Sequence, residues 1–156
     1  VACVKMGRNF IGCEIDEECF KISKEKGYEI YKSLNKIKGK FDFVVLNEVV
    51  EHLDLEEAKD FFKKIQFYLY PKGKLILSTP NPNEAYTKLN EHEPHKKLYF
   101  IEELKKIGEE NNFKTIKIIK HHIRVNPIKI IKNLIKRKDI HAGYTIFMEY
   151  QDKTTH

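Results

Sequence analysis

The order of apolar and polar positions divides the chain into alternating strands and helices. Two apolar blocks, at residues 41–46 and 74–79, predict buried parallel strands. Between them, apolar residues recur at helical spacing and predict a helix from Leu55 to Tyr70, which Pro71 ends. This alternation is typical of an α/β fold.

Further elements follow from the same patterns. Asp16 is placed to cap a helix, and Asp54 with Glu57 has the spacing of a capping box. The last two strands are expected to pair as antiparallel neighbours. The predicted helices lie at 1–6, 17–26, 48–53 and 100–112, and the remaining predicted strands at 9–16, 28–31, 113–124 and 142–150.

Polar residues gather where the strand at 41–46 ends. Asn47 and Glu48 follow it directly, and Glu51 and His52 come one turn later. Ligands of open α/β sheets bind at the carboxyl ends of the strands, so we expect a functional site here. Asn47 has a second interpretation, as the cap of a short helix from Glu48 to Leu53.

Composition suits one compact domain over residues 1–156. The chain is 41% hydrophobic and 33% charged, and it has no apolar run of membrane-spanning length, which favours a cytoplasmic protein. The net charge of +6 has a local origin, because residues 114–138 contain nine Lys or Arg and no acid. An insertion at about 126–139 holds a basic amphipathic helix at 127–138. This helix could cover the active site, bind an anionic membrane or nucleic acid, or simply pack on the body.

Three stretches resemble class I methyltransferases that use S-adenosylmethionine (SAM). F-D-F-V-V-L-N-E-V-V-E-H-L and P-K-G-K-L-I-L-S-T-P-N resemble their fourth and fifth strands, and G-R-N-F-I-G-C-E-I-D resembles their second. Small-molecule O-methyltransferases of the ubiquinone-biosynthesis type are the most similar group. The resemblance implies a Rossmann-like, mostly parallel sheet with helices on both faces and an antiparallel C-terminal strand.

The resemblance also implies a cofactor site for SAM. Glu14 matches the acid that accepts hydrogen bonds from the ribose hydroxyls, and a carboxylate has two oxygens for a vicinal diol. Asp16 is its neighbour, and Ser33 lies where the family contacts adenine. Asn47 and Glu48 match positions beside the methyl group and the amino-acid part of SAM.

Catalytic and substrate residues are assigned by the same likeness. His52 and His95 match histidines that help to deprotonate a hydroxyl, a task that suits imidazole, although His52 could instead be structural. Asn81 and Tyr99 match positions that handle substrate. The run of Glu and His at 91–95 lacks the spacing of a metal site, so no metal is predicted.

The family's first strand and its G-x-G-x-G turn have no counterpart, because the seven glycines are scattered singly. The chain is then a fragment or truncation, a domain that has lost its cofactor, or one that another chain completes. A missing central strand leaves a sheet edge through which copies of the chain could associate.

The predicted function is methyl transfer from SAM to a hydroxyl or amine of a small molecule. A catalytically inactive binding or assembly protein is the alternative. A nucleic-acid base methyltransferase is less favoured, because N-E-V-V stands where such enzymes have D-P-P-Y or N-P-P-Y.

Overall fold

The computed structural model describes residues 2–82, 95–122 and 141–152. It divides into two compact units, Val1–Gly39 and Lys40–His156. The predicted basic helix at 127–138 lies outside the described residues, as do residues 91–94 of the Glu- and His-containing loop. Within the described ranges, no helix has the length and apolar character needed to cross a membrane.

The first unit is built on a short parallel strand pair. Strands β1 (Gly12–Cys13) and β2 (Ile30–Tyr31) are connected through helix α2 (Glu17–Glu25), with Gly12 opposite Ile30. Asp16 caps α2 as predicted, since its Oδ1 accepts the Cys19 N–H at 2.8 Å. The predicted strands are confirmed but are shorter than expected. The unit also contains helix α1 and the 3₁₀ helix η1, at Ala2–Lys5 and Leu34–Lys36.

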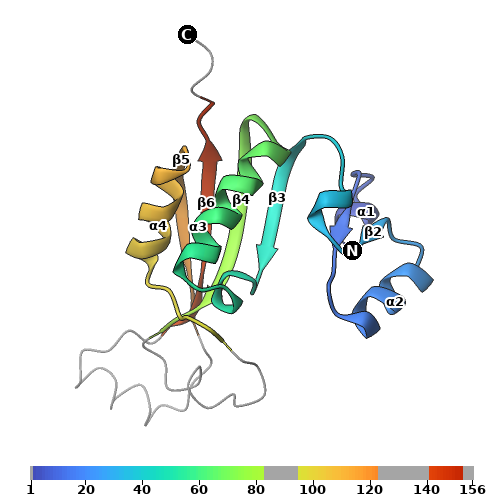
Figure 1. Ribbon diagram of the computed structural model, residues 1–156, viewed down its shortest axis with the longest axis horizontal. Coiled ribbons are helices and arrows are strands. Elements are labelled where there is room, and N and C mark those ends of the chain that lie inside the picture. Colours follow the sequence, from blue (N-terminus) through green and yellow to red (C-terminus); the bar gives the residue numbers. More distant parts are fainter. Residues whose placement is uncertain (1, 83–94, 123–140, 153–156) are drawn as a thin grey trace. The chain divides into compact units, whose positions relative to one another are not determined.

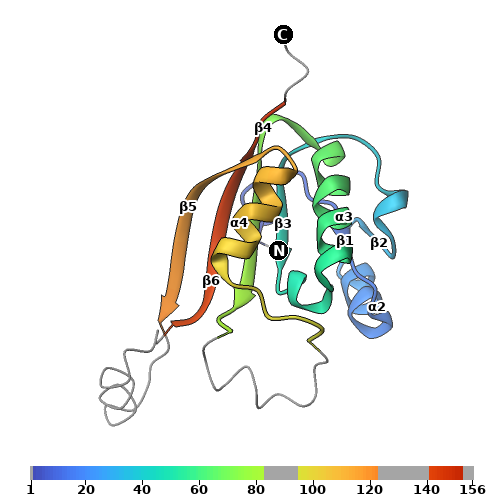
Figure 2. The same cartoon turned by 60° about the vertical axis from the view of Figure 1, so that its left-hand side comes forward.

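The second unit is a four-stranded sheet with the order β3-β4-β6-β5 (Figure 1). Strands β3 and β4 are parallel, whereas β4 with β6 and β5 with β6 are antiparallel. The last two strands lie side by side, as Figure 2 also shows. The strands span Phe41–Asn47 (β3), Leu69–Pro80 (β4), Phe113–His122 (β5) and His141–Tyr150 (β6).

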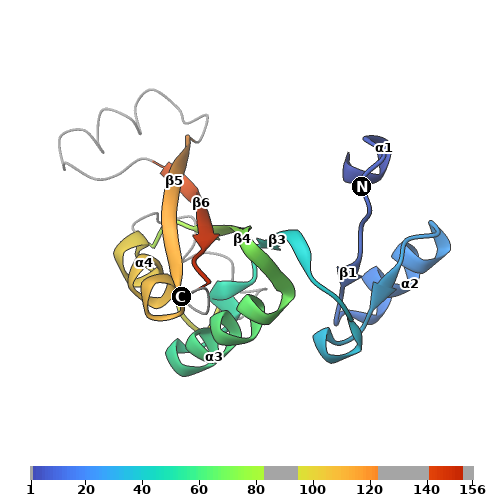
Figure 3. The ribbon, with the colours of Figure 1, turned by 90° about the horizontal axis from the view of Figure 1, so that it is seen from above.

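Helices α3 (Leu55–Ile65) and α4 (Ile101–Glu110) cover the same face of this sheet (Figure 3). The predicted capping box of α3 is confirmed: the Glu57 side chain accepts the Asp54 N–H at 2.8 Å, and the Asp54 side chain accepts the Glu57 N–H at 2.9 Å. The helices bury apolar side chains against alternate residues of β4 and β6. The fully buried members of this core include Ala58, Phe62, Leu75, Leu77, Leu104, Ile146 and Met148.

Two expectations about this unit need correction. The sheet is mixed rather than mostly parallel, because two of its three strand pairs are antiparallel. The described helices of this unit lie on one face, and helices on both faces of the sheet stay a prediction. The strand at 41–46 is not buried throughout: Phe43 and Val45 are 58% and 63% exposed, since α3 and α4 pack on the opposite side of β3.

The predicted helix from Leu55 to Tyr70 is too long. The α-helix ends at Ile65, a 3₁₀ turn η3 follows at Gln66–Tyr68, and β4 begins at Leu69. Pro71 therefore lies in extended backbone after the helix. Leu69 is fully buried within the strand, and a buried residue at this position fits both a helical and a strand period.

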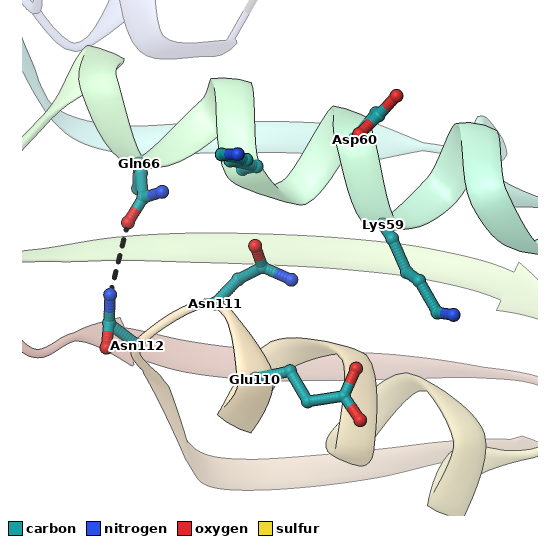
Figure 4. A pocket seen from close by; sticks show the side chains of 7 residues that line it. Lys59, Asp60, Gln66, Glu110, Asn111 and Asn112 are labelled. Atoms are coloured by element: carbon teal, nitrogen blue, oxygen red, sulfur yellow. Dashed lines mark hydrogen bonds between the residues drawn. The ribbon is translucent and has the colours of Figure 1, made fainter.

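A polar hollow lies between α3 and α4, with a volume of about 430 Å³ (Figure 4). Asn112 Nδ2 donates to Gln66 Oε1 across it at 3.4 Å. The lining consists of long charged and amide side chains, and it brings no convergent group of the kind that binds a cofactor. The lining residues are Lys59, Asp60, Lys63, Gln66, Glu110, Asn111 and Asn112.

Among the described residues of the second unit, one carboxyl group is fully buried. Glu51 lies in the 3₁₀ helix η2 (Val50–His52), and its Oε2 accepts a hydrogen bond from Thr79 Oγ1 at 3.4 Å. No described group donates to its Oε1. Burial, and secondarily the Glu48 carboxylate, raises the pKa of Glu51 from 4.5 to about 7.

The close approach of β6 to β4 generates a stability prediction. A Cβ at Gly143 would lie 2.7 Å from the backbone oxygen of Thr79, whereas one at Gly108 would meet the flexible end of Met148 at 2.8 Å. We expect Gly143→Ala to destabilise the fold by about 1 to 3 kcal/mol, because the backbone of β4 must move. Thermal unfolding should show a smaller loss for Gly108→Ala, the control, where the side chain yields and the helix gains propensity. Equal losses would contradict this account.

The buried Glu51 predicts a pH dependence of stability. Between pH 4.5 and about 7 the folded chain holds a proton that the unfolded chain has released, so its free energy of unfolding falls as the pH rises. Glu51→Gln removes this dependence. In the parent chain, the raised pKa lowers the free energy of unfolding by about 2.5 kcal/mol from pH 5 to pH 8. Since about 1 kcal/mol moves the Tm by roughly 2 to 4 °C, we expect the Tm of the parent chain to drop by roughly 5 to 10 °C relative to the variant over this range.

The measurement is thermal unfolding in EDTA across this pH range. Glu56→Gln is the matched control, because the Glu56 side chain is 79% exposed. Parallel curves for Glu51→Gln and the parent chain would show that Glu51 ionises normally in the folded state.

Candidate active site

The carboxyl ends of β3 and β4 are joined by one side chain, Ser78. Its hydroxyl donates to Asn47 Oδ1 at 3.2 Å and accepts the Glu48 N–H at 3.1 Å. Asn47 lies opposite Ser78 in the strand register. The pairing of β3 with β4 therefore holds the first residues after β3 in place.

Asn47 does not cap the following helix, so that interpretation is wrong. It is the last residue of β3, and η2 begins at Val50 with Val49 in the cap position and no side-chain capping bond. Glu48 between them has a φ of 51°, in the left-handed region that few non-glycine residues adopt. The chain turns sharply there, and this turn brings Glu51 beneath the end of β4.

Glu51, His52 and His95 form a compact group next to this turn. One ligand atom from each residue lies within 4.8 Å of those of the other two. The two imidazole rings are tilted at 60° with their centroids 5.2 Å apart. Glu51 is buried and both histidines are half-buried, so the group joins the core to the surface.

Backbone and side-chain bonds fix the segment that carries His95. The Lys97 N–H donates to the Glu51 carbonyl oxygen at 3.1 Å, and the Lys96 Nζ lies 2.7 Å from Glu57 Oε1. The Tyr99 hydroxyl donates to the Leu53 carbonyl oxygen at 2.9 Å. The segment is thus fastened to η2 and to the start of α3, which sets His95 beside His52.

The two predicted substrate residues are both buried. Tyr99 is fully buried, its hydroxyl is bonded to Leu53, and burial raises its pKa to about 12. Asn81 is also fully buried, directly after β4. Tyr99 thus has a clear structural contribution, while a substrate role for either residue stays a prediction.

The predicted cofactor residues of the first unit lie around its two strands. Glu14 follows β1, and its Oε1 accepts the Asp16 N–H at 2.9 Å. Hydrogen bonding to the Cys19 backbone lowers the pKa of Asp16. Ser33 follows β2 and caps η1, since its Oγ accepts the Asn35 N–H at 3.4 Å. Glu14 and Asp16 therefore share the turn into α2.

Sequence reasoning missed two parts of this arrangement. Ser78 and Thr79 were treated only as strand residues, although their hydroxyls bond Asn47 and Glu51. The grouping of His95 with Glu51 was also missed, because it depends on contacts distant in sequence. Alternation along β4 was the available signal, since it places Thr79 on the buried face with Leu75 and Leu77.

Solved structures share this fold. A SAM-dependent methyltransferase from Archaeoglobus fulgidus matches with a TM-score of 0.76 and 25% identity, over 95% of this chain and 79% of that one. Magnesium protoporphyrin IX methyltransferase from Synechocystis PCC 6803 with bound SAH matches with a TM-score of 0.72 and 16% identity, over 97% and 68%. A SAM-dependent methyltransferase from Methanosarcina mazei gives 0.69 and 14%, over 96% and 85%.

A family model extends the comparison from fold to sequence. The search of curated proteins found no match. The model described as a methyltransferase domain matches residues 5–118, which is most of the chain and includes the ends of β1, β3 and β4. The resemblance expected from the sequence is therefore confirmed, and the chain belongs to the class I SAM-dependent methyltransferase family.

Proposed function

We propose that this chain transfers a methyl group from SAM to a hydroxyl or amine of a small molecule. The observation that carries the proposal is the match of residues 5–118 to the methyltransferase domain, in a chain whose β3 ends in the fixed Asn47–Glu48 turn. This turn lies at the carboxyl end of a parallel strand, where ligands of α/β sheets bind.

The donor set of the chain fits the cofactor. Glu14 uses one carboxylate oxygen for the Asp16 N–H, and an ionised carboxylate has further lone pairs that suit the hydroxyls of a ribose. By the family's sequence pattern alone, Asn47 and Glu48 correspond to contacts with the methionine part of SAM, and Ser33 corresponds to a contact with the adenine. When bound, SAM supplies an electrophilic methyl group on a sulfonium, so the protein has mainly to orient the acceptor.

Proton removal from the acceptor falls to the histidines in this proposal. A hydroxyl acceptor must lose its proton as its oxygen is methylated, and imidazole is suited to this near neutral pH. His52 and His95 are half-buried, so both side chains keep part of their surface open to solvent. The fixed segment at 95–99 keeps the two rings together, which favours a base with a defined position.

The cofactor proposal predicts an effect of Glu14. Glu14→Gln keeps an oxygen for the Asp16 N–H but removes the charge and one of the acceptor oxygens. Hydrogen bonds to a charged group contribute about 1.5 to 3 kcal/mol, so we expect the variant to bind S-adenosylhomocysteine at least roughly tenfold more weakly. Isothermal titration calorimetry of both chains measures this change.

Glu25→Gln is the control for this experiment, because Glu25 is an exposed acid at the far end of α2. It should bind the ligand as the parent chain does. Absence of binding by the parent chain at millimolar S-adenosylhomocysteine would contradict the proposal that these residues bind the cofactor.

Ser78 is predicted to affect the affinity for the same ligand indirectly, because it holds the Asn47–Glu48 turn in position. Ser78→Ala removes both bonds that hold the Asn47–Glu48 turn, and a hydrogen bond of about 1 kcal/mol corresponds to roughly fivefold in affinity. We therefore expect roughly three- to tenfold weaker binding of S-adenosylhomocysteine, restored by Ser78→Thr, which keeps the hydroxyl. A fall in Tm with unchanged affinity would mean that the two bonds only stabilise the sheet.

A further inference from the structure

We propose that Glu51, His52 and His95 bind a divalent transition-metal ion, with Zn²⁺ or Co²⁺ as suitable probes. The three residues offer one carboxylate oxygen and two imidazole nitrogens. These ligand types are shared by zinc sites and by the sites of other first-row divalent metals. The spacing of Glu and His at 91–95 predicted no metal site, but that prediction used the residues of this loop alone, without Glu51 and His52.

The geometry brings the three ligand atoms close to coordination distance. They lie within 4.8 Å of one another. Ligands about 2.0 to 2.2 Å from a tetrahedral zinc ion are separated by roughly 3.3 to 3.6 Å. Movements of about an ångström would bring the ligand atoms from this separation to that of a tetrahedral site.

An unsatisfied buried oxygen points to a ligand. Glu51 has no exposed surface, its Oε2 is bonded to Thr79, and its Oε1 has no hydrogen-bond partner among the described residues. A buried polar atom without a partner destabilises a fold by about 1 to 3 kcal/mol, and more when charged. A cation between Glu51 and the two histidines satisfies this oxygen.

The supporting structure holds the ligands in advance. Glu51 and His52 are neighbours in η2, and the Glu51 carbonyl accepts the N–H of Lys97, two residues beyond His95. Tyr99 adds a second bond to the Leu53 carbonyl. Ligands fixed by outer contacts bind metal more tightly than mobile ones.

With an ion bound, the ligating nitrogens of His52 and His95 could not act as bases, and the ion would assist proton removal in their place; its binding does not depend on SAM. A bound cation lowers the pKa of a water or hydroxyl that it contacts, which would assist the deprotonation of an acceptor. This consequence rests on the proposed function. Occupancy of the site does not, and it is measured without cofactor.

The test is a titration of the whole chain, stripped with EDTA and dialysed, with Zn²⁺ by calorimetry and with Co²⁺ by visible absorption. We expect one ion per chain at micromolar Kd or tighter, Co²⁺ bands typical of low coordination number, and a higher Tm with Zn²⁺. Glu51→Gln, His52→Ala and His95→Ala should each weaken binding by roughly tenfold or more. Circular dichroism checks that each variant folds.

His121→Ala is the matched control, because His121 lies in β5 and contacts Thr145 Oγ1 at 2.6 Å. It should bind zinc as the parent chain does. Two results would overturn the proposal: no binding at 100-fold excess of Zn²⁺ over the chain, or binding that His95→Ala weakens while Glu51→Gln leaves it unchanged. The second result would place the ion on the loop and exclude the buried carboxylate. Since SAM is absent, neither result bears on cofactor binding.

Discussion

The register of β3 against β4 is the constraint on which the second unit depends. Asn47 lies opposite Ser78, so both strands reach the same level of the sheet before the chain turns. A slip by one residue would move Ser78 away from Asn47 and turn the buried residues of β4 toward solvent. Leu75 and Leu77, fully buried beneath α3 and α4, oppose such a slip. Apolar burial on one face of the sheet thus sets the position of polar groups at its end.

Fixing that end also fixes a segment distant in sequence. Val50 and Glu51 are buried, so the backbone of η2 is held close to the core, and its carbonyl groups become anchors. The N–H of Lys97 bonds to the Glu51 carbonyl in η2, and the hydroxyl of Tyr99 bonds to the carbonyl of Leu53, the residue that follows η2. Neither bond uses the side chains of His52 or His95, so backbone contacts help to set the positions of the two rings.

Local rules in the sequence predicted the elements that depend on local interactions. The capping box of α3 and the cap of α2 were correct, because each involves residues three apart. The parallel pairing of β3 with β4 and the antiparallel pairing of β5 with β6 were also correct. The family's three motifs lie on β1, β3 and β4, which explains why the resemblance could be found in the sequence.

The errors fall where tertiary contacts decide between equivalent patterns. Leu69 satisfies both a helical and a strand spacing, and its pairing with β3 places it in a strand. Phe43 and Val45 are apolar and exposed, because the described helices of this unit pack on the other side of β3. Asn47 is a residue type that often caps helices, but its side-chain oxygen accepts a hydrogen bond from Ser78 instead.

Two energetically costly features occur within four residues of each other. Glu48 has a left-handed backbone, and Glu51 is a buried carboxyl with one oxygen that no described group bonds. Unfavourable backbone angles and buried polar groups each destabilise a fold by about 1 to 3 kcal/mol, and such features concentrate at functional sites. Most other buried side chains among the described residues are apolar, with Thr79 and Asn81 as the other buried polar ones. Both features lie in or next to the turn after β3, at the end of the sheet where ligands of α/β proteins bind, and they are the structural basis for placing the proposed site there.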